Sequence, residues 1–147
     1  MGFKLERVHV WLGEIADKAG GMASVLAPLA EAKANLEYIL TRRQTDRPGT
    51  GIVYVAPITG AAQVRAAKAS GLHESNQTIV LRVEGDNETG LGYRLTQTWA
   101  TAGISLQGLT MAVMGGRFVG FAAFDTVNDA NRAAQILADL SATAAKG

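Results

Sequence analysis

The residues best suited to chemistry lie in two glycine-containing turns, "DKAGGM" from Asp17 to Met22 and "DNETGL" from Asp86 to Leu91. Each turn joins an alternating apolar segment to a segment with helical spacing. A glycine turn at a helix start points backbone amides outward, and the helix dipole favours an anion there. Neither turn holds a cysteine, a histidine or a serine beside a base. The pattern therefore favours binding over reaction.

The rest of the sequence offers no stronger centre for catalysis or metal binding. There is no cysteine, so a disulfide, a thiolate nucleophile and a cysteine-ligated zinc are excluded. The two histidines, His9 and His73, belong to different predicted strands and have no partner at metal-ligand spacing. Asp125 and Asp129 bracket a strand end and a helix start, which indicates capping. We therefore expect no catalytic residue, no metal and no cofactor.

Charge and hydropathy exclude several classes of partner. The chain has 147 residues, 48% of them hydrophobic, and a formal net charge of +1. So small a charge gives no long-range attraction to nucleic acid or to an acidic membrane. No apolar run is long enough for a membrane span, and charges interrupt the first ten residues. We expect a cytoplasmic globular protein, and we interpret the adjacent Arg42 and Arg43 as a solvated strand end.

The two turns belong to a longer internal repeat. Asp17 matches Asp86 and Gly21 matches Gly90, at an offset of 69 residues. The same offset aligns "VHVWL" (8–12) with "QTIVL" (77–81), "KANLEYI" (33–39) with "AGISLQG" (102–108), and "GIVYV" (51–55) with "GFAAF" (120–124). Element order and hydrophobic phase agree along both copies. The sequence therefore predicts two tandem modules, residues 1–74 and 75–147.

Each module reads as β-α-β-β-α-β. The first has expected strands at 8–12, 35–43, 52–58 and 72–75, with helices after the turn and at 59–70. The second has an expected strand at 78–85, a helix at 90–103, two strands around the Gly115-Gly116 turn and a helix at 127–140. The predicted fold class is α+β, with two tandem ferredoxin-like modules, antiparallel sheets and helices on one face.

The second module lacks an obvious final strand, because residues 141–147 read as a polar tail. The repeat offset aligns residues 3–6 with residues 72–75. The start of the chain is therefore expected to supply the missing strand. Exposed sheet edges invite aggregation, so we also expect the two modules to join edge to edge in one extended sheet.

The first turn and the segments after it resemble the ACT domain, a small ligand-binding module. The resemblance is carried by "DKAGGMASVL" with "ANLEYI", and again by "DNETGLGYRL" with "AGISLQGL". It covers roughly residues 4–140. Two departures are Ala19, where the family often has proline, and Gly103-Ile104, where the first copy has Ala34-Asn35.

The resemblance implies a regulatory protein that binds an amino acid or another small metabolite and acts on a separate partner enzyme. ACT domains usually bind across an interface between two units, which leaves a homodimer open. A free amino acid would offer its carboxylate to the turn amides and its ammonium to an acid or amide side chain. The implied ligand-binding residues are Asp17, Lys18, Gly20, Gly21, Met22, Asn35 and Leu36 in the first copy and Asn87, Glu88, Gly90 and Leu91 in the second.

Three alternatives remain open at this point. Asp17 and Asn87 could simply cap helices, while the glycines only permit tight turns. The chain could be a small ferredoxin-like enzyme with a cleft between sheet and helices, for which His9 and Tyr54 are the conceivable residues. It could also be a structural adaptor that binds no ligand.

Overall fold

The computed structural model describes residues 2–146, with side chains described as far as Ser141. The chain forms two compact units. The continuous unit comprises residues 9–75, and the split unit comprises the residues before His9 together with those from Asn76 onward. Within residues 2–146, no helix is both long enough and apolar enough to cross a membrane.

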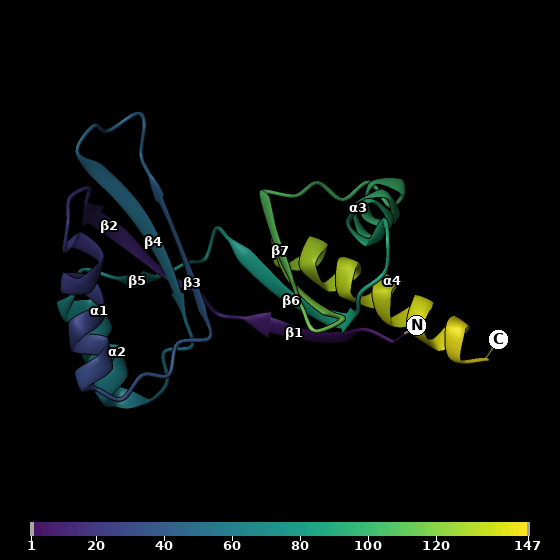
Figure 1. Ribbon diagram of the computed structural model, residues 1–147, viewed down its shortest axis with the longest axis horizontal. Coiled ribbons are helices and arrows are strands. Elements are labelled where there is room, and N and C mark those ends of the chain that lie inside the picture. Colours follow the sequence, from purple (N-terminus) through teal and green to yellow (C-terminus); the bar gives the residue numbers. More distant parts are fainter. Residues whose placement is uncertain (1, 147) are drawn as a thin grey trace. The chain divides into compact units, whose positions relative to one another are not determined.

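The continuous unit is built from four strands and two helices, and α1 and α2 lie on one face of its sheet (Figure 1). The order is β2 (Trp11–Ala16), α1 (Gly21–Glu31), β3 (Tyr38–Arg43), β4 (Thr50–Ala56), α2 (Gly60–Ala69) and β5 (His73–Glu74). The sheet is antiparallel, with strand order β3-β4-β2-β5. Alternate residues such as Trp11, Ile15 and Val53 are buried, because successive strand side chains point to opposite faces.

The split unit repeats this arrangement. Its elements are β1 (Lys4–Val8), β6 (Ile79–Asp86), α3 (Leu91–Thr101), β7 (Gly108–Met114), β8 (Arg117–Phe124) and α4 (Val127–Lys146). The strand order is β1-β6-β8-β7, which matches the continuous unit if β1 takes the place of β5. Trp99 anchors the core, because its Nε1 donates to the Ala133 carbonyl at 3.2 Å and its ring meets Phe124 edge to face at 5.5 Å.

The predicted fold class is confirmed. Across the described residues, eight strands form two antiparallel sheets that are accompanied by four helices. Each unit follows the β-α-β-β-α-β order, with β1 completing the split unit. The glycine that follows α2, Gly71, has φ 84°, as expected for a residue that ends a helix in the left-handed conformation.

The start of the chain lies at the edge of the split unit's sheet. β1 pairs antiparallel with β6, from Lys4 opposite Glu84 to Val8 opposite Val80. The backbone amide of Phe3 donates to Ser141 Oγ at 3.0 Å, so α4 holds the residue before β1. The chain thus begins in the split unit, passes through the continuous unit and returns.

Three sequence-based expectations differ from the structure. The strand expected at 8–12 is divided, because β1 ends at Val8 in one sheet and β2 begins at Trp11 in the other. The expected polar tail continues α4 as far as Lys146, in keeping with the high helix propensity of its alanines. The expectation of one extended sheet is wrong, because the strands form two separate four-stranded sheets.

Candidate ligand-binding site

The turn between β2 and α1 depends on two glycines for different reasons. Gly20 is the N-cap of α1 and has φ 85°, a left-handed conformation that favours glycine. A Cβ atom on Gly21 would lie 2.1 Å from the carbonyl oxygen of Ala16. The helix can therefore start this close to the end of β2 only where a side chain is missing.

The first turn of α1 leaves two amides without an acceptor. The Gly21 amide donates to the Lys18 carbonyl at 3.0 Å, and the Ser24 amide donates to the Gly20 carbonyl at 3.0 Å. Between them, the amides of Met22 and Ala23 have no acceptor among the described residues, as is usual for the first helical positions. The donors available to a ligand are thus Met22 and Ala23, whereas Gly21 is already used.

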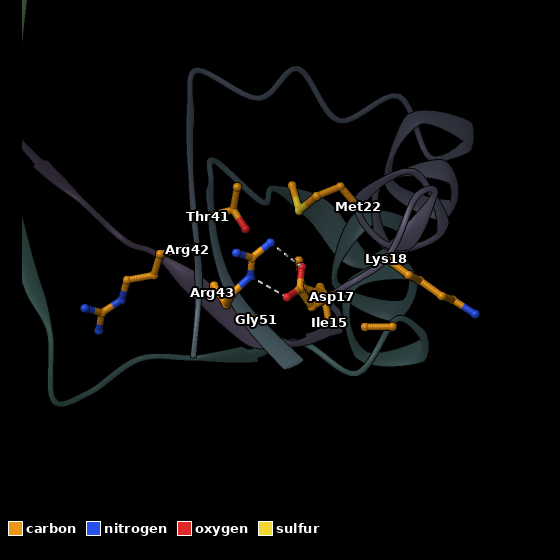
Figure 2. Close-up of a pocket in the computed structure, with 9 residues that line it drawn as sticks. Ile15, Asp17, Lys18, Met22, Thr41, Arg42, Arg43 and Gly51 are labelled. Carbon is orange, nitrogen blue, oxygen red and sulfur yellow. Dashed lines mark hydrogen bonds and ion pairs between the residues drawn. The ribbon is translucent and has the colours of Figure 1, made fainter. Parts of the chain in front are cut away.

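A pocket of about 370 Å³ lies beside this turn (Figure 2). Its volume is near the lower end of the range of about 300–1,000 Å³ that is typical of small-molecule sites. The turn, the start of α1 and the adjoining ends of β3 and β4 form its wall. The lining residues are Ile15, Ala16, Asp17, Lys18, Met22, Thr41, Arg42, Arg43 and Gly51.

Strand register brings the last residue of β3 to this pocket. Arg43 lies opposite Gly51 on β4, and Gly51 lies opposite Ile15 on β2. The guanidinium of Arg43 is therefore carried to the turn that follows β2, although Arg43 is far from that turn in sequence. Residues directly opposite one another share a face of the sheet, which places Arg43 on the same face as the buried Ile15.

Asp17 and Arg43 form an ion pair within the pocket. Arg43 Nε lies 2.5 Å from Asp17 Oδ2, and Arg43 Nη2 donates to Asp17 Oδ1 at 3.4 Å. The hydrogen bond to Asp17, together with its charge, raises the pKa of the Arg43 guanidinium above its ordinary value. The Asp17 side chain is 29% exposed and that of Arg43 is 73% exposed, so water reaches the pair mainly from the arginine side.

The other charged side chains that line the pocket do not converge on it. Figure 2 shows the guanidinium of Arg43 directed toward Asp17, with Thr41 and Met22 nearby. The Lys18 and Arg42 side chains extend away from this group (Figure 2). The chemistry of the pocket is therefore set by one carboxylate, one guanidinium, a hydroxyl and a thioether.

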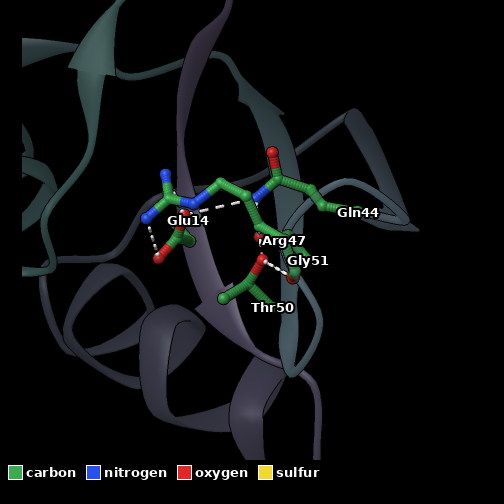
Figure 3. Close-up of polar contacts among 5 residues, drawn as sticks. All are labelled: Glu14, Gln44, Arg47, Thr50 and Gly51. Atoms are coloured by element: carbon green, nitrogen blue, oxygen red, sulfur yellow. Dashed lines mark hydrogen bonds and ion pairs between the residues drawn. The ribbon is translucent and has the colours of Figure 1, made fainter.

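A polar network holds the loop between β3 and β4 against β2 (Figure 3). Arg47 Nη1 lies 2.8 Å from Glu14 Oε2, and Gln44 Nε2 donates to Thr50 Oγ1 at 3.1 Å. The Thr50 hydroxyl donates to the Arg47 carbonyl at 2.6 Å.

The same loop also binds the turn through its backbone. It includes Gly49, whose carbonyl oxygen accepts a hydrogen bond from the Asp17 amide at 3.0 Å. The backbone of the turn is thus held by the loop at Asp17 and by its own hydrogen bond from the Gly21 amide to the Lys18 carbonyl.

The second turn corresponds to the first at an offset of 70 residues. Gly90 is the N-cap of α3 with φ 80°, as Gly20 is for α1. The offset of 69 expected from matching Asp17 with Asp86 is therefore wrong by one residue at the turns. The left-handed glycine at each N-cap determines which residues of the two turns correspond. The matching aspartates and glycines in the sequence do not determine it. Asn87 is consequently the counterpart of Asp17.

The second turn lacks both charges of the ion pair. Val113 lies opposite Phe118, at the place where Arg43 lies opposite Gly51. The carboxylate position is taken by Asn87, whose amide donates to the Gly116 carbonyl at 2.8 Å. The two copies therefore present different chemistry at the same place in the fold.

Packing at the second turn also differs. Gly92 is the counterpart of Met22, and Met111 is the counterpart of Thr41. The Met111 sulfur lies 3.8 Å from the position that a Cβ on Gly92 would occupy. Glu88, in the turn before α3, forms an ion pair with Arg94 of that helix. The Met111 side chain thus fills space at the second turn that is an open pocket at the first turn.

The sequence-predicted residues divide into three groups. Asp17, Lys18 and Met22 line the pocket, while Gly20 and Gly21 shape the turn. Asn35 and Leu36 lie beyond the C-terminal end of α1, and a helix of this length spans about 16 Å. Leu36 packs against the core of the continuous unit, and Asn35 is exposed. Asn87, Glu88, Gly90 and Leu91 form the second turn or begin its helix.

Sequence reasoning missed two residues that face the pocket, Thr41 and Arg43. The β-α-β order could have indicated them, since it places the end of β3 near the end of β2. Neither His9 nor Tyr54 lines the pocket. Among the described residues, no group of three or more histidine, aspartate or glutamate side chains is arranged to hold a metal ion.

Comparison with solved structures identifies the fold. Protein BT0572 from Bacteroides thetaiotaomicron aligns with a TM-score of 0.74 at 12% identity, over 93% of this chain and 97% of its own. The regulatory subunit of aspartate kinase from Thermus thermophilus aligns with a TM-score of 0.65 at 17% identity, over 93% and 95%. Aspartokinase III from E. coli aligns with a TM-score of 0.58 at 12% identity, over 92% and 32%. No family model and no curated protein matches the chain. The fold is therefore ACT-like, as in aspartate kinase regulatory domains.

Proposed function

We propose that the chain is a regulatory protein that binds an amino acid beside the turn between β2 and α1 and acts on a separate partner enzyme. The observation that carries this proposal is the convergence of one carboxylate and one guanidinium, Asp17 and Arg43, on a pocket beside two unused amides. The fold supports the regulatory part, because regulatory subunits of aspartate kinase share it.

The pocket offers a partner for each charged end of an amino acid. The carboxylate of the ligand accepts from the guanidinium of Arg43 and from the amides of Met22 and Ala23. The ammonium group of the ligand donates to Asp17. The ligand side chain faces Met22 and Thr41, which suit a small uncharged group. Hydrogen bonds to charged groups contribute about 1.5–3 kcal/mol each, which is enough for a specific site.

We propose binding rather than catalysis because several side-chain types that commonly act as nucleophile or base are missing from the pocket lining. Its lining contains no histidine, serine, cysteine or tyrosine. The carboxylate of Asp17 already accepts hydrogen bonds from two nitrogens of the Arg43 guanidinium. A structural adaptor would need the two glycines for the turn but would not need the ion pair.

The first prediction concerns Arg43. We expect at least one of the twenty amino acids to raise the melting temperature of the protein, because a ligand that binds only the folded state stabilises it. Arg43→Gln should weaken binding of that amino acid roughly 10–100-fold, since it removes a charge-assisted hydrogen bond. Titration calorimetry measures the change.

A matched control is available in the split unit. Arg117 forms an ion pair of the same type with Asp86, at 2.9 Å. Arg117→Gln should leave the affinity for the amino acid unchanged. The proposal fails if no amino acid raises the melting temperature, or if Arg43→Gln binds as tightly as the unmodified protein.

A further inference from the structure

The ion pair occupies both groups that an amino acid would use in this pocket. Asp17 takes two nitrogens of the Arg43 guanidinium, at 2.5 Å and 3.4 Å. This inference rests on the proposed function. We propose that the site is closed when this ion pair is formed. An amino acid opens it by exchange, its carboxylate replacing Asp17 at Arg43 and its ammonium replacing Arg43 at Asp17.

The position of the ion pair keeps the free-energy cost of breaking it small. Asp17 lies in a turn and Arg43 ends an edge strand, so the two side chains belong to separate elements. The pair is partly exposed, and ion pairs in contact with water contribute little net stability. The Asp17 amide remains bonded to the Gly49 carbonyl, so rotation of the side chains is sufficient.

The same pair selects the class of ligand. A simple carboxylate can replace Asp17 at Arg43, but it then leaves the partly exposed Asp17 without a cation. A simple amine leaves Arg43 without an anion. Only a zwitterion satisfies both groups at once, and a site rejects ligands that leave its own polar groups unpaired. L-alanine and propionate form a matched pair of probes, since they differ only in the ammonium group.

The second turn provides an internal comparison. Asn87 and Val113 take the places of the two charged residues. Neither can form an ion pair, so no exchange of this kind can occur there. The inference therefore assigns one zwitterion site to each chain, in the continuous unit.

The test uses Asp17→Asn, which keeps the shape of the side chain but removes its charge. Because Arg43 is then free, propionate should bind this variant roughly 2–5-fold more tightly than the unmodified protein, in line with the strength of exposed ion pairs. L-alanine should bind the variant less tightly than the unmodified protein, because its ammonium has lost its partner. NMR titration at constant ionic strength, following Arg43 Nε–H and the Met22 amide, measures both.

Two further variants complete the test. Arg43→Gln should weaken binding of both probes. Asp86→Asn, which breaks a surface ion pair of the same type in the split unit, should change neither. Equal or weaker propionate binding by Asp17→Asn overturns the exchange. If that result occurs while an amino acid still raises the melting temperature, the proposed function stands without the closed pair. If propionate binding rises but no amino acid binds, Asp17 does compete with anions for the Arg43 guanidinium, and the proposed amino-acid function is wrong.

Discussion

Gly21→Ala is expected to lower the free energy of unfolding of the continuous unit by on the order of 3 kcal/mol. The new Cβ would lie 2.1 Å from the Ala16 carbonyl oxygen. That oxygen belongs to the backbone of β2 and cannot move aside without shifting the strand or the helix. A displaced helix would also carry the Met22 and Ala23 amides away from the pocket, so amino-acid binding should be lost as well.

Gly20→Ala provides the matched comparison. A Cβ on Gly20 meets nothing within 4 Å, but its φ of 85° is unfavourable for any residue with a side chain. We expect a cost of about 1–2 kcal/mol for the left-handed conformation alone. A larger loss for Gly20→Ala than for Gly21→Ala would show that backbone conformation, and not close packing, governs the turn.

The two tryptophans allow each unit to be followed separately. The chain has one in each unit, Trp11 in the continuous unit and Trp99 in the split unit, and both are buried. Their indole Nε1 NMR signals therefore report the two unfolding transitions in one urea titration. Gly21→Ala should lower the midpoint of the Trp11 transition and leave that of Trp99 nearly unchanged.

Deletion of residues 1–6 is expected to destabilise the split unit by about 3 kcal/mol. Phe3 meets Phe118 edge to face at 6.1 Å, and both Phe3 and Leu5 pack against the core. Full burial of one large apolar side chain contributes about 1.5–3 kcal/mol, and these two are partly buried. The deletion also removes a hydrogen bond to Ser141 and exposes the edge of β6.

The same urea titration measures this effect. The midpoint reported by Trp99 should fall, while the midpoint reported by Trp11 should stay within error. Glu6→Ala is the control, because Glu6 is exposed and its loss should change little. An unchanged Trp99 midpoint after the deletion would mean that β1 does not stabilise the split unit.

Much of the fold could be predicted from the sequence because its signals are local. Alternating apolar residues indicate β4 and β6, and Gly71 ends α2. The division between Val8 and Trp11 could not be predicted in this way. Both sides have the alternation of a strand, and only the pairing of β1 with β6 decides that the chain changes sheets there.

The candidate site was predicted only in part, for a physical reason. The glycines at the first turn act on their immediate neighbours, so the sequence reveals them. Arg43 reaches Asp17 through the register of three strands, which no local pattern records. Asn35 follows the first helix in the ACT-like sequence pattern, but β3 begins at the far end of that helix. The resemblance indicates which residues lie near one another in the sequence. The strand topology determines which residues come into contact.

The most direct test of the amino-acid site is an NMR titration of the unmodified protein with the amino acid that gives the largest thermal shift. We expect the amides of Met22 and Ala23 and the Nε–H of Arg43 to change chemical shift along one binding curve, with one amino acid bound per chain. Residues 87–91 of the second turn should not respond. Shifts confined to residues 87–91, or the absence of any response at Met22, Ala23 and Arg43, would contradict the proposed site.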